Sequence, residues 1–510
     1  MNTALLRTLI IYAVILPLAV LVGWMAVDLA DWNRTSFAIF AAILFVLLLP
    51  VMIKWHYPVM VFSWSTYITI FFLPGQPGLW MVMVGITLGI AVLNRIIQKQ
   101  GAFLPAPSIT VTLLALLVVV VITAKLRGGF GVQALGGSSV GGKPYYYIIA
   151  GILGYFAFAS QPIPPERAKL YAALFFLPGI VTVGSTLIYY AGPAFYFLFL
   201  IFPVGFAAVQ ALNEYGGGVS RIAGFTVAAT SVGYFLLARY GAAGVLRKWW
   251  RLLLLLFLLA LGAMGGYRST LALFGLIFVV LFLAEGLLRS PMFPAMLLIG
   301  TLVAMVMVPF TDKLPPSMQR SLSFLPVKID PAIRADAEGS IDWRVEIWQL
   351  MVPELPKYFW LGKGYAQDMT DIYLTQQAVR RNRASANAGA ILSGDYHSGP
   401  LSVYIPFGVF GSLAFVAFLG VSIRALSLNY RYGRPELRML NRFLFAYFTG
   451  RVIFFVVAFG SISGDLYLLT GTVGLSVALN RGICRKPVQA PKPVQFRGNL
   501  RLRATQPGVA

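Results

Sequence analysis

Cysteine and histidine are scarce in this sequence of 510 residues, which contains one cysteine and two histidines. The single cysteine, Cys484, lies in a basic C-terminal segment, which excludes a disulfide framework and a cysteine cluster for a metal. The histidines, His56 and His397, lie far apart in the sequence, which argues against a histidine-rich metal site. We therefore predict neither a metal nor a cofactor.

Charged residues are also scarce: they make up 11% of the chain, whereas 59% of its residues are hydrophobic. Many windows of about 18–22 residues contain no charge, which is enough to cross a bilayer core of roughly 30 Å. Within lipid such segments must be helical, because every backbone polar group has to bond internally. We predict an all-α, polytopic transmembrane helical bundle of about 14 spans with one large, partly helical extracytoplasmic loop.

Acidic residues are outnumbered by basic ones, 17 to 40, and the formal net charge is +23. The basic residues concentrate in short loops, of which 239–251 carries four without an acid and 424–442 carries five with one acid. The tail 481–510 carries seven without an acid. Basic residues in short loops mark the cytoplasmic side. The charge therefore indicates topology and an attraction to anionic membrane lipids, not nucleic-acid binding.

The basic loops set the predicted topology of the C-terminal part of the chain. If the C-terminal tail is cytoplasmic and successive spans cross in opposite directions, the basic loops lie inside and 311–396 lies outside. Continued further, this alternation places Arg95 and Lys99 outside, against the same rule. The conflict disappears if one apolar segment between 170 and 238 is interfacial or half-inserted. The apolar spans lie at about 8–29, 36–53, 57–73, 78–94, 107–124, 145–160, 170–190, 193–212, 222–238, 252–265, 270–287, 292–310, 400–422, 443–460 and 466–480.

Residues 311–396 form the one sizeable hydrophilic segment, with ten basic and ten acidic residues. In DWRVEIWQLMVPELPKYFWLGKGYAQ, four apolar residues have the spacing of an amphipathic helix, namely Val345, Trp348, Met351 and Val352. Pro353 and Pro356 are expected to end that helix. We expect an ordered extracytoplasmic cap, because four aromatic residues supply a core for it: Trp343, Trp348, Phe359 and Trp360.

Two familiar kinds of site are disfavoured. The loop GGSSVGGKP (136–144) has glycines and Lys143 at P-loop spacing, but Pro144 stands where a magnesium-binding Ser or Thr is required. We interpret it as a flexible glycine-rich loop. Glu285 is the only acid in the apolar part of a span, and ion-coupled transporters usually carry ionisable residues at mid-membrane. The chain also has no D-x-D pair for a metal beside a diphosphate.

His397 lies where the hydrophilic segment meets the span 400–422. The plain interpretation is an interfacial histidine that tolerates its position. However, Gly408 and Gly411 follow it at +11 and +14, and Gly408 is predicted to let another helix approach and fix the helix that carries His397. A neutral imidazole accepts a proton from a hydroxyl near pH 7. We therefore single out His397 as the candidate catalytic residue.

Two arginines outside the basic loops are candidates for binding an anion. Arg268, in GGYRSTLALFGL, heads a span on the outer side, where the positive-inside trend disfavours it, although snorkelling is the plain explanation. Arg344 lies in the cap, where it would ordinarily be a solvated surface charge. A guanidinium is always charged and bonds phosphate through two N–H groups.

Arg451 and Asp465 are candidate supporting residues. Arg451 falls in the middle of the span 443–460, where a charge is costly and usually paired or functional. Its predicted partner is Glu285 or a lipid diphosphate. Asp465, in SISGDLY, returns to the outer face and is predicted to orient His397 or an arginine.

Three stretches together resemble the O-antigen ligase and O-antigen polymerase family of bacterial integral membrane glycosyltransferases. GYRSTLALFGLIFVVLFL is similar to an arginine-led span of that family, and DWRVEIWQLMVPELPKYFWLGKGYA to its Arg…Trp…Pro…Gly-x-Gly element. HSGPLSVYIPFGVFG is similar to its closing His-Asn-x-x-Leu…Gly-x-x-Gly motif. The match covers roughly 213–480, and three positions depart from the usual residue: Ser398, Pro406 and Tyr267.

The resemblance implies inverting, metal-independent glycan transfer on the periplasmic face of the bacterial inner membrane. The donor would be a glycan on undecaprenyl diphosphate, and the acceptor a sugar hydroxyl of a glycan or lipid-linked glycan. His397 would remove the proton of the acceptor, Arg268 and Arg344 would bind the diphosphate, and Arg451 and Asp465 would support them. The chain would divide into N-terminal helices (1–212), core helices (213–310), a periplasmic loop domain (311–396), C-terminal helices (397–480) and a basic cytoplasmic tail (481–510).

Several alternatives remain open from the sequence. Polymerase and ligase are not separated, and neither are the sugars and the acceptor. A transporter or flippase for lipid-linked oligosaccharide or polysaccharide is the alternative from another class. In that case the arginines would line a passage and His397 would be dispensable. A structural scaffold for envelope assembly is the third hypothesis.

Overall fold

The computed structural model describes residues 53–70, 75–98, 103–129, 141–215, 221–381 and 388–485, together with the single residues 50, 73 and 219. The predicted span 8–29, nearly all of 36–53, most of the glycine-rich loop 136–144 and the tail beyond 485 lie outside these residues.

The described residues form helices joined by turns, with one isolated antiparallel bridge between Thr69 and Gly78. After a helix over 53–63, the N-terminal half comprises α3 (Leu79–Gln98), α4 (Pro107–Arg127), α5 (Lys143–Phe158), η2 (Pro165–Arg167), α6 (Ala168–Phe176), η3 (Leu177–Val181), α7 (Thr182–Ala191), η4 (Pro193–Leu200) and α8 (Val204–Tyr215). The next group comprises α9 (Ala223–Leu246), α10 (Trp249–Ala263), α11 (Arg268–Ala284), η5 (Leu287–Arg289), α12 (Met292–Met307) and η6 (Val308–Lys313). The cap, which we define as residues 311–396, comprises α13 (Pro316–Leu322), α14 (Pro331–Met351), η7 (Val352–Tyr358), α15 (Met369–Arg380) and α16 (Ala388–Ser393). The chain then continues through α17 (Gly399–Tyr432), η8 (Pro435–Leu437), α18 (Arg438–Val457) and α19 (Ile462–Asn480).

Seven helical stretches in the described part of the chain are long and apolar enough to cross a membrane, and α10 and α11 are shorter apolar helices. The prediction of an all-α, multi-pass membrane protein is therefore confirmed. The number of about 14 spans stays a prediction.

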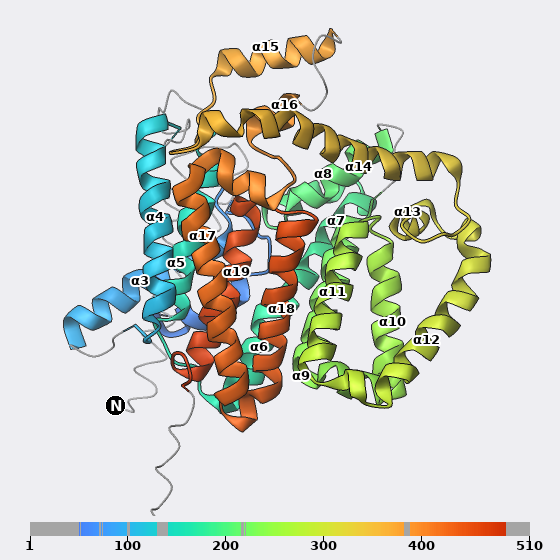
Figure 1. Ribbon diagram of the computed structural model, residues 1–510, viewed down its shortest axis with the longest axis horizontal. Helices are drawn as coiled ribbons and strands as arrows, with labels where there is room; N and C mark the ends of the chain where they lie inside the picture. Colours follow the sequence, from blue (N-terminus) through green and yellow to red (C-terminus); the bar gives the residue numbers. More distant parts are fainter. Residues whose placement is uncertain are drawn as a thin grey trace, which may run out of the picture.

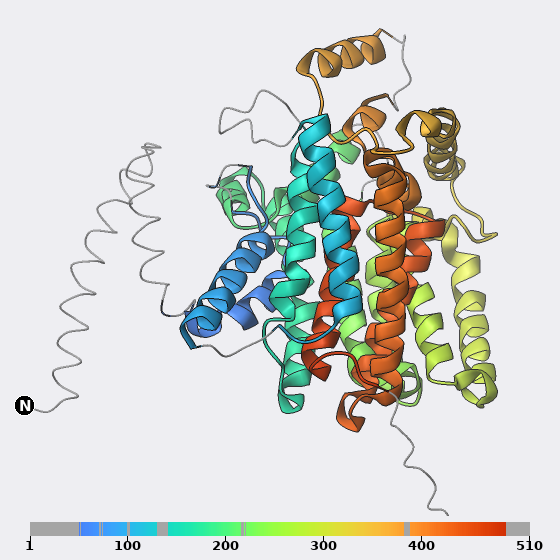
Figure 2. The same ribbon diagram turned by 60° about the vertical axis from the view of Figure 1, so that its left-hand side comes forward.

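The helical bundle has two ends (Figures 1 and 2). The cap helices lie at one end, which we call the cap end, and the last described residues lie at the other, the tail end. The basic loops 239–251 and 424–442 lie at the tail end. Asn429, in the second loop, donates to the carbonyl of Gly482 over 3.3 Å. The two loops are in contact, because a Cβ atom on Gly241 would lie 2.6 Å from the sulfur of Met439. The basic loops thus share one side, as the alternation requires.

The segment 193–212 does not cross the bundle. It forms η4 and α8, and Phe206 of α8 makes a ring contact of 5.4 Å with Tyr67, which lines the cavity beside the cap. Arg221, just before α9, pairs with Asp336 of the cap at 3.9 Å. Because the segment stays at the cap end, it is the non-crossing segment that the sequence required.

The connection that follows α3 reaches α4 at the tail end. Leu104 donates its N–H to the carbonyl of Ala159 over 2.9 Å, and Ile163 donates to Ala478, near the end of α19, over 2.9 Å. Arg95, in the last turn of α3, therefore precedes a tail-end connection, and its conflict with the positive-inside rule disappears. Lys99 lies outside the described residues.

The prediction of one span over 57–73 was wrong, because the helix there ends at residue 63. Ser63 Oγ donates to the carbonyl of Met60 over 2.8 Å, and Thr66 Oγ1 donates to that of Ser63 over 3.0 Å. Such side-chain bonds compete with the helical backbone pattern. Tyr67 follows with a φ of +57°, and this turn carries it to the cavity at the cap end.

Helices α5 and α19 pack closely in the centre of the bundle. A Cβ atom on Gly151 would lie 3.3 Å from the backbone of Tyr467, and Thr470 Oγ1 donates to the carbonyl of Gly151 over 2.7 Å. Gly154 leaves room for the ring of Trp64, which contacts Tyr467 at 5.8 Å. Small residues let helices approach closely where water supplies no driving force. This packing fixes Tyr467, which lines the cavity.

Candidate active site at the cap end

His397 is held between two aromatic rings in an unusual backbone conformation. Its φ is +46°, in the left-handed region that residues other than glycine seldom adopt. Its ring centroid lies 4.4 Å from that of Trp343 on α14 and 5.2 Å from that of Phe459, nearly parallel to the latter. Nδ1 lies 3.3 Å from Asp395 Oδ1 and makes no hydrogen bond. The imidazole is thus clamped between the cap and the α18–α19 connection.

The start of α17 fixes the place of His397, which precedes it by two residues. A Cβ atom on Gly399 would lie 2.1 Å from the carbonyl oxygen of Phe455, so α17 and α18 touch through this glycine. Ser402 Oγ accepts the N–H of Ile462 over 3.0 Å, which ties α17 to the first residue of α19.

The surroundings of His397 favour its neutral form. Burial lowers the pKa of His397 from its ordinary value of 6.5, the carboxylate of Asp395 opposes that shift, and the charge of Arg344 lowers the pKa further. The site therefore favours the uncharged imidazole, the form that is able to accept a proton.

A segment of the cap enters a break in α17. The break lies at Gly408, whose φ is +62°, two residues after Pro406. Three backbone hydrogen bonds join the cap segment 359–364 to it: Lys363 N–H to Ile405 O (2.7 Å), Gly364 N–H to Pro406 O (3.1 Å) and Val409 N–H to Phe359 O (2.7 Å). A Cβ atom on Gly408 would lie 2.5 Å from the carbonyl oxygen of Trp360. The neighbour of Gly408 is thus this cap segment and not the helix that we predicted.

Helix α14 docks on α17 through a small apolar cluster. Its Ile347 and Met351 are buried against Tyr396, Leu401 and Ile405. The helix ends at Met351, directly before the prolines, as predicted. This docking places Trp343 over His397.

The predicted buried face of α14 was partly wrong. Val345, Trp348 and Val352 are 49%, 40% and 44% exposed, and Phe359 and Trp360 are exposed as well. Trp360 meets Phe410 of α17 at 6.0 Å, beside the exposed apolar flank of that helix. Aromatic residues commonly lie at the membrane–water interface. These exposed apolar side chains of the cap therefore do not require other parts of the protein to cover them.

Arg268 and Arg344 belong to a group that we call the arginine cluster, which also contains Arg221 and Arg320. Arg268 interacts electrostatically with the other three, and burial together with the charge of Arg320 lowers the pKa of Arg344. One carboxylate, that of Asp336, pairs with Arg221 and Arg320. Arginines gathered against their own repulsion create a strongly positive potential at the cap end.

Arg344 connects this cluster to His397. Its Cζ lies 5.4 Å from the ring centre of Phe459, the same ring on which His397 stacks. Arg268 is held from the cap: Nη1 donates to Ser323 Oγ over 3.3 Å and Nη2 donates to the carbonyl of Ala337. The structure thus brings the predicted histidine and both predicted arginines to one end of the bundle.

Sequence reasoning missed Arg221 and Arg320. Arg320 donates to the carbonyl of Gly266 over 2.6 Å and so fixes the turn that precedes Arg268. Arg221 lies just before α9 at the cap end, so the argument that singled out Arg268 would have found it as well. Arg320 lies in the cap among ten basic residues, and the sequence carries no signal that distinguishes it from them.

Arg451 and Asp465 pair with each other at 3.6 Å. The guanidinium of Arg451 lies 4.7 Å from the ring centre of Tyr447, and Asp465 Oδ2 accepts the N–H of Ser461 over 3.0 Å. Of the two roles foreseen for Asp465, the geometry therefore favours orienting an arginine. The carboxylate beside His397 is Asp395, which sequence reasoning did not single out.

Glu285 is not the partner of Arg451. Its two carboxylate oxygens accept the N–H groups of Ala242 and Ala243 over 2.8 and 2.9 Å. These groups are freed by a break in α9 at Gly241, whose φ is +67°. Glu285 therefore caps a helix break at the tail end, away from the site.

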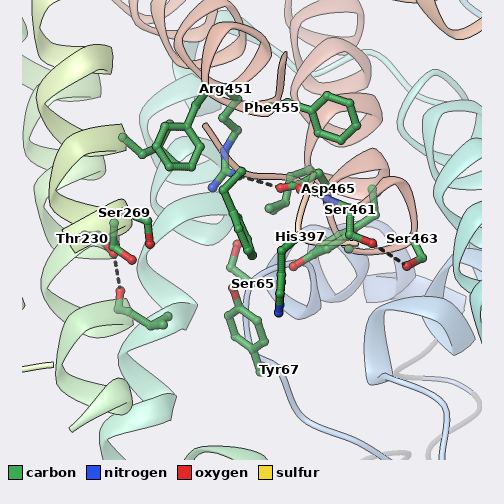
Figure 3. Close-up of a pocket in the computed structure, with 18 of the residues that line it drawn as sticks. Ser65, Tyr67, Thr230, Ser269, His397, Arg451, Phe455, Ser461, Ser463 and Asp465 are labelled. Carbon is green, nitrogen blue, oxygen red and sulfur yellow. Dashed lines mark hydrogen bonds and ion pairs between the residues drawn. The ribbon is translucent and has the colours of Figure 1, made fainter. Parts of the chain in front are cut away.

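A cavity of about 700 Å³ opens beside His397 (Figure 3). His397, Arg451 and Asp465 line it, whereas Arg268 and Arg344 do not. Its wall is rich in hydroxyl groups, which come from Ser65, Tyr67, Thr230, Ser231, Tyr234, Ser269, Thr270, Tyr447, Ser461 and Ser463. Concave sites of this size with a few placed polar groups are typical of ligand binding. Among the residues that the structure describes, no group of three or more His, Cys, Asp or Glu side chains is placed to hold a metal ion.

Fold and site together define a multi-pass helical membrane protein with a cap over a polar cavity, a half-buried histidine and clustered arginines. Residues 251–416 match a family model described as O-Antigen ligase, so the resemblance to the O-antigen ligase and polymerase family is confirmed. That region contains Arg268, Arg344 and His397 but ends before Arg451 and Asp465. Among curated proteins, none matches the chain.

Proposed function

We propose that this protein is a metal-independent, inverting glycosyltransferase of the O-antigen or exopolysaccharide polymerase or ligase type. It would move a glycan from undecaprenyl diphosphate to a sugar hydroxyl. One observation carries the proposal: a neutral imidazole stands between a hydroxyl-lined cavity and a cluster of arginines at the cap end of a membrane bundle.

In the proposed reaction, His397 acts as the general base. With Asp395 on the side of Nδ1, Nε2 is the nitrogen that accepts the proton of the acceptor hydroxyl. The acceptor oxygen forms a bond to the anomeric carbon as the bond from that carbon to the phosphate oxygen breaks. The electron pair of the broken bond leaves on undecaprenyl diphosphate. Attack opposite the leaving group inverts the anomeric configuration.

The arginines stabilise the leaving group in this proposal. Arg344 carries positive charge near His397, and Arg268 carries positive charge near Arg344. The departing diphosphate would gain its negative charge there. Their guanidinium groups suit two-point bonding to phosphate oxygens. This charge would serve the purpose that a divalent ion serves in other transferases of diphosphate-linked sugars.

The arrangement also suggests the side of the membrane and the division of the chain. Basic loops lie at the tail end, so we place that end in the cytoplasm and the cap, with the site, in the periplasm of the bacterial inner membrane. The helices 213–310 and 397–480 would form the catalytic core, and the cap 311–396 would supply Arg344 and Trp343. A lipid-tethered donor and a hydrophilic acceptor can meet at that boundary.

Purified protein in nanodiscs tests the proposal. The donor would be lipid-linked glycan extracted from a strain that lacks this protein, and a membrane extract of the same strain would supply the acceptor. We expect glycan transfer that persists in EDTA and is lost in His397→Ala. Transfer at the wild-type rate by His397→Ala would refute the general base. In proteoliposomes, movement of the lipid-linked glycan across the bilayer without a new glycosidic bond would indicate the transporter.

A further inference from the structure

The cavity beside His397 differs in charge from the arginine cluster. Apart from His397, whose neutral form is favoured by burial, its ionisable acidic and basic side chains are those of Asp395, Arg451 and Asp465. Two carboxylates therefore face one guanidinium within the described lining. The arginine cluster has the opposite balance, with four guanidinium groups and Asp336 as the carboxylate paired with them.

Arg451 has a donor that the protein leaves unused. Its Nε–H is buried without a hydrogen-bond partner, although the side chain is held by Asp465 and lies over Tyr447. In Figure 3 the side chain of Arg451 reaches into the cavity toward Asp465. A buried donor without an acceptor is destabilising, so this N–H is suited to an acceptor on a ligand.

The rest of the wall matches the surface of a sugar. The eight serine and threonine hydroxyls of the lining, which include that of Ser393, both donate and accept hydrogen bonds. Phe455, Phe459 and Tyr447 supply aromatic faces. Hydroxyl groups of a sugar need both donors and acceptors, which the Arg451–Asp465 pair offers side by side. A carboxylate on the ligand would approach two carboxylates, Asp395 and Asp465, that face a single guanidinium.

We propose that this cavity is a subsite for an uncharged sugar residue of the acceptor, with Arg451 and Asp465 as the residues that set its specificity. The inference rests on the proposed transfer reaction and adds a substrate class to it. Negative charge is kept at the arginine cluster, and the hydroxyl to be glycosylated is presented to His397 from the cavity.

Binding of two kinds of free oligosaccharide to the full-length protein in nanodiscs tests this inference by titration calorimetry. The uncharged probes are short oligosaccharides that end in a hexose or an N-acetylhexosamine, and each matched probe ends in the corresponding hexuronic acid. Because a like charge is costly in such a site, we expect the uncharged probes to bind at least about tenfold more tightly. Asp465→Asn keeps the shape of the side chain but removes its negative charge. It should therefore reduce the ratio between the affinities for the uncharged and the acidic probes several-fold.

A matched control is Arg442→Lys, compared with Arg451→Lys. Both arginines lie on α18 over a tyrosine ring, but Arg442 faces Tyr430 at the tail end. Arg451→Lys should weaken binding of the uncharged probes, whereas Arg442→Lys should leave it unchanged. Thermal unfolding midpoints of the variants verify that they are folded, and the preference of the wild type needs no variant.

The inference is overturned if the acidic probes bind as tightly as the uncharged ones, or if neither kind binds. It is also overturned if Asp465→Asn leaves the preference unchanged. Two further outcomes distinguish failure of this inference from failure of the proposed function. Transfer by the wild type without any binding preference leaves the transferase and removes the subsite. A binding preference without transfer from any lipid-linked donor removes the transferase.

Discussion

At the scale of single residues, the site depends on one aromatic ring shared by two functional groups. Phe459 stacks on His397 from one direction and lies beneath the guanidinium of Arg344. The proposed base and a permanently charged guanidinium are therefore neighbours, and the charge of Arg344 lowers the pKa of His397. The carboxylate of Asp395 acts on the histidine in the opposite direction.

These opposing influences predict the pH dependence of transfer. His397 accepts a proton only when it is neutral, so the rate should fall as the pH drops through its pKa, which lies below 6.5. Asp395→Asn removes the group that raises this pKa, so the acid limb of the rate profile should move to lower pH. Arg344→Gln should move it to higher pH.

The control for these profiles is Asp371→Asn, which changes an exposed acid of the cap helix α15. Its acid limb should coincide with that of the wild type. Shifts of Asp395→Asn and Arg344→Gln in the same direction would contradict the electrostatic account of His397.

Arg344→Lys tests whether the proposed binding of the diphosphate needs the shape of the guanidinium and not only its charge. A lysine keeps the positive charge but loses the planar pair of N–H donors, so we expect kcat/KM to fall by about tenfold or more. Arg334→Lys on the same helix, where the arginine bonds the carbonyl of Val327, is the matched control and should be near wild type. Kinetics of the two purified variants decide between them. Equal activity of both variants would contradict the proposed role of Arg344 in binding the diphosphate.

At the scale of elements, the cap and the bundle are joined where α17 breaks. Glycine stands at the break because the φ of +62° and the carbonyl of Trp360 leave no place for a Cβ atom. The motif that contains Pro406 and Gly408 was visible in the sequence, but its partner was not. That partner, Gly362–Gly364 of the cap, is more than 40 residues away in the chain, and a motif does not state what it contacts.

Gly408→Ala should therefore destabilise the protein by about 1–3 kcal/mol and lower transfer, because it strains the joint that positions the cap. Gly420→Ala on the same helix has open space around it and should change stability by no more than about 0.5 kcal/mol. Thermal unfolding in detergent, with transfer measured in parallel, compares the two. An unaffected Gly408→Ala variant would show that the cap is positioned by other contacts.

At the scale of the whole molecule, composition predicted the class and charge predicted the sides, since both follow from the bilayer as a solvent. Hydropathy could not distinguish a helix that crosses from one that lies at the boundary, so 193–212 and 57–73 were both counted as spans. The prediction of site residues was limited too, because the sequence does not show which side chains the fold brings together. His397 and Arg268 were singled out because each stood out against its position, and Arg344 was singled out through the family resemblance. Tyr67 and Asp395 reach the cavity only through the fold.

Cysteine labelling tests this topology. In a Cys484→Ser background, Tyr373→Cys in the cap should react with an impermeant maleimide on spheroplasts. Glu436→Cys and Arg95→Cys should react only after lysis. Glu436 lies in a tail-end connection, and Arg95 lies in the last helical turn before one. Labelling of Arg95→Cys on intact spheroplasts would mean that 193–212 crosses the membrane after all.

The most direct measurement of the central claim is a gel profile of surface polysaccharide from a strain lacking this protein. The strain would be complemented with wild type or His397→Ala at matched expression, and lipid-linked glycan would be followed in the membrane. We predict that His397→Ala fails to restore the polymer or ligated product and that glycan accumulates on its lipid carrier. A normal product profile with His397→Ala would contradict transfer chemistry at this histidine.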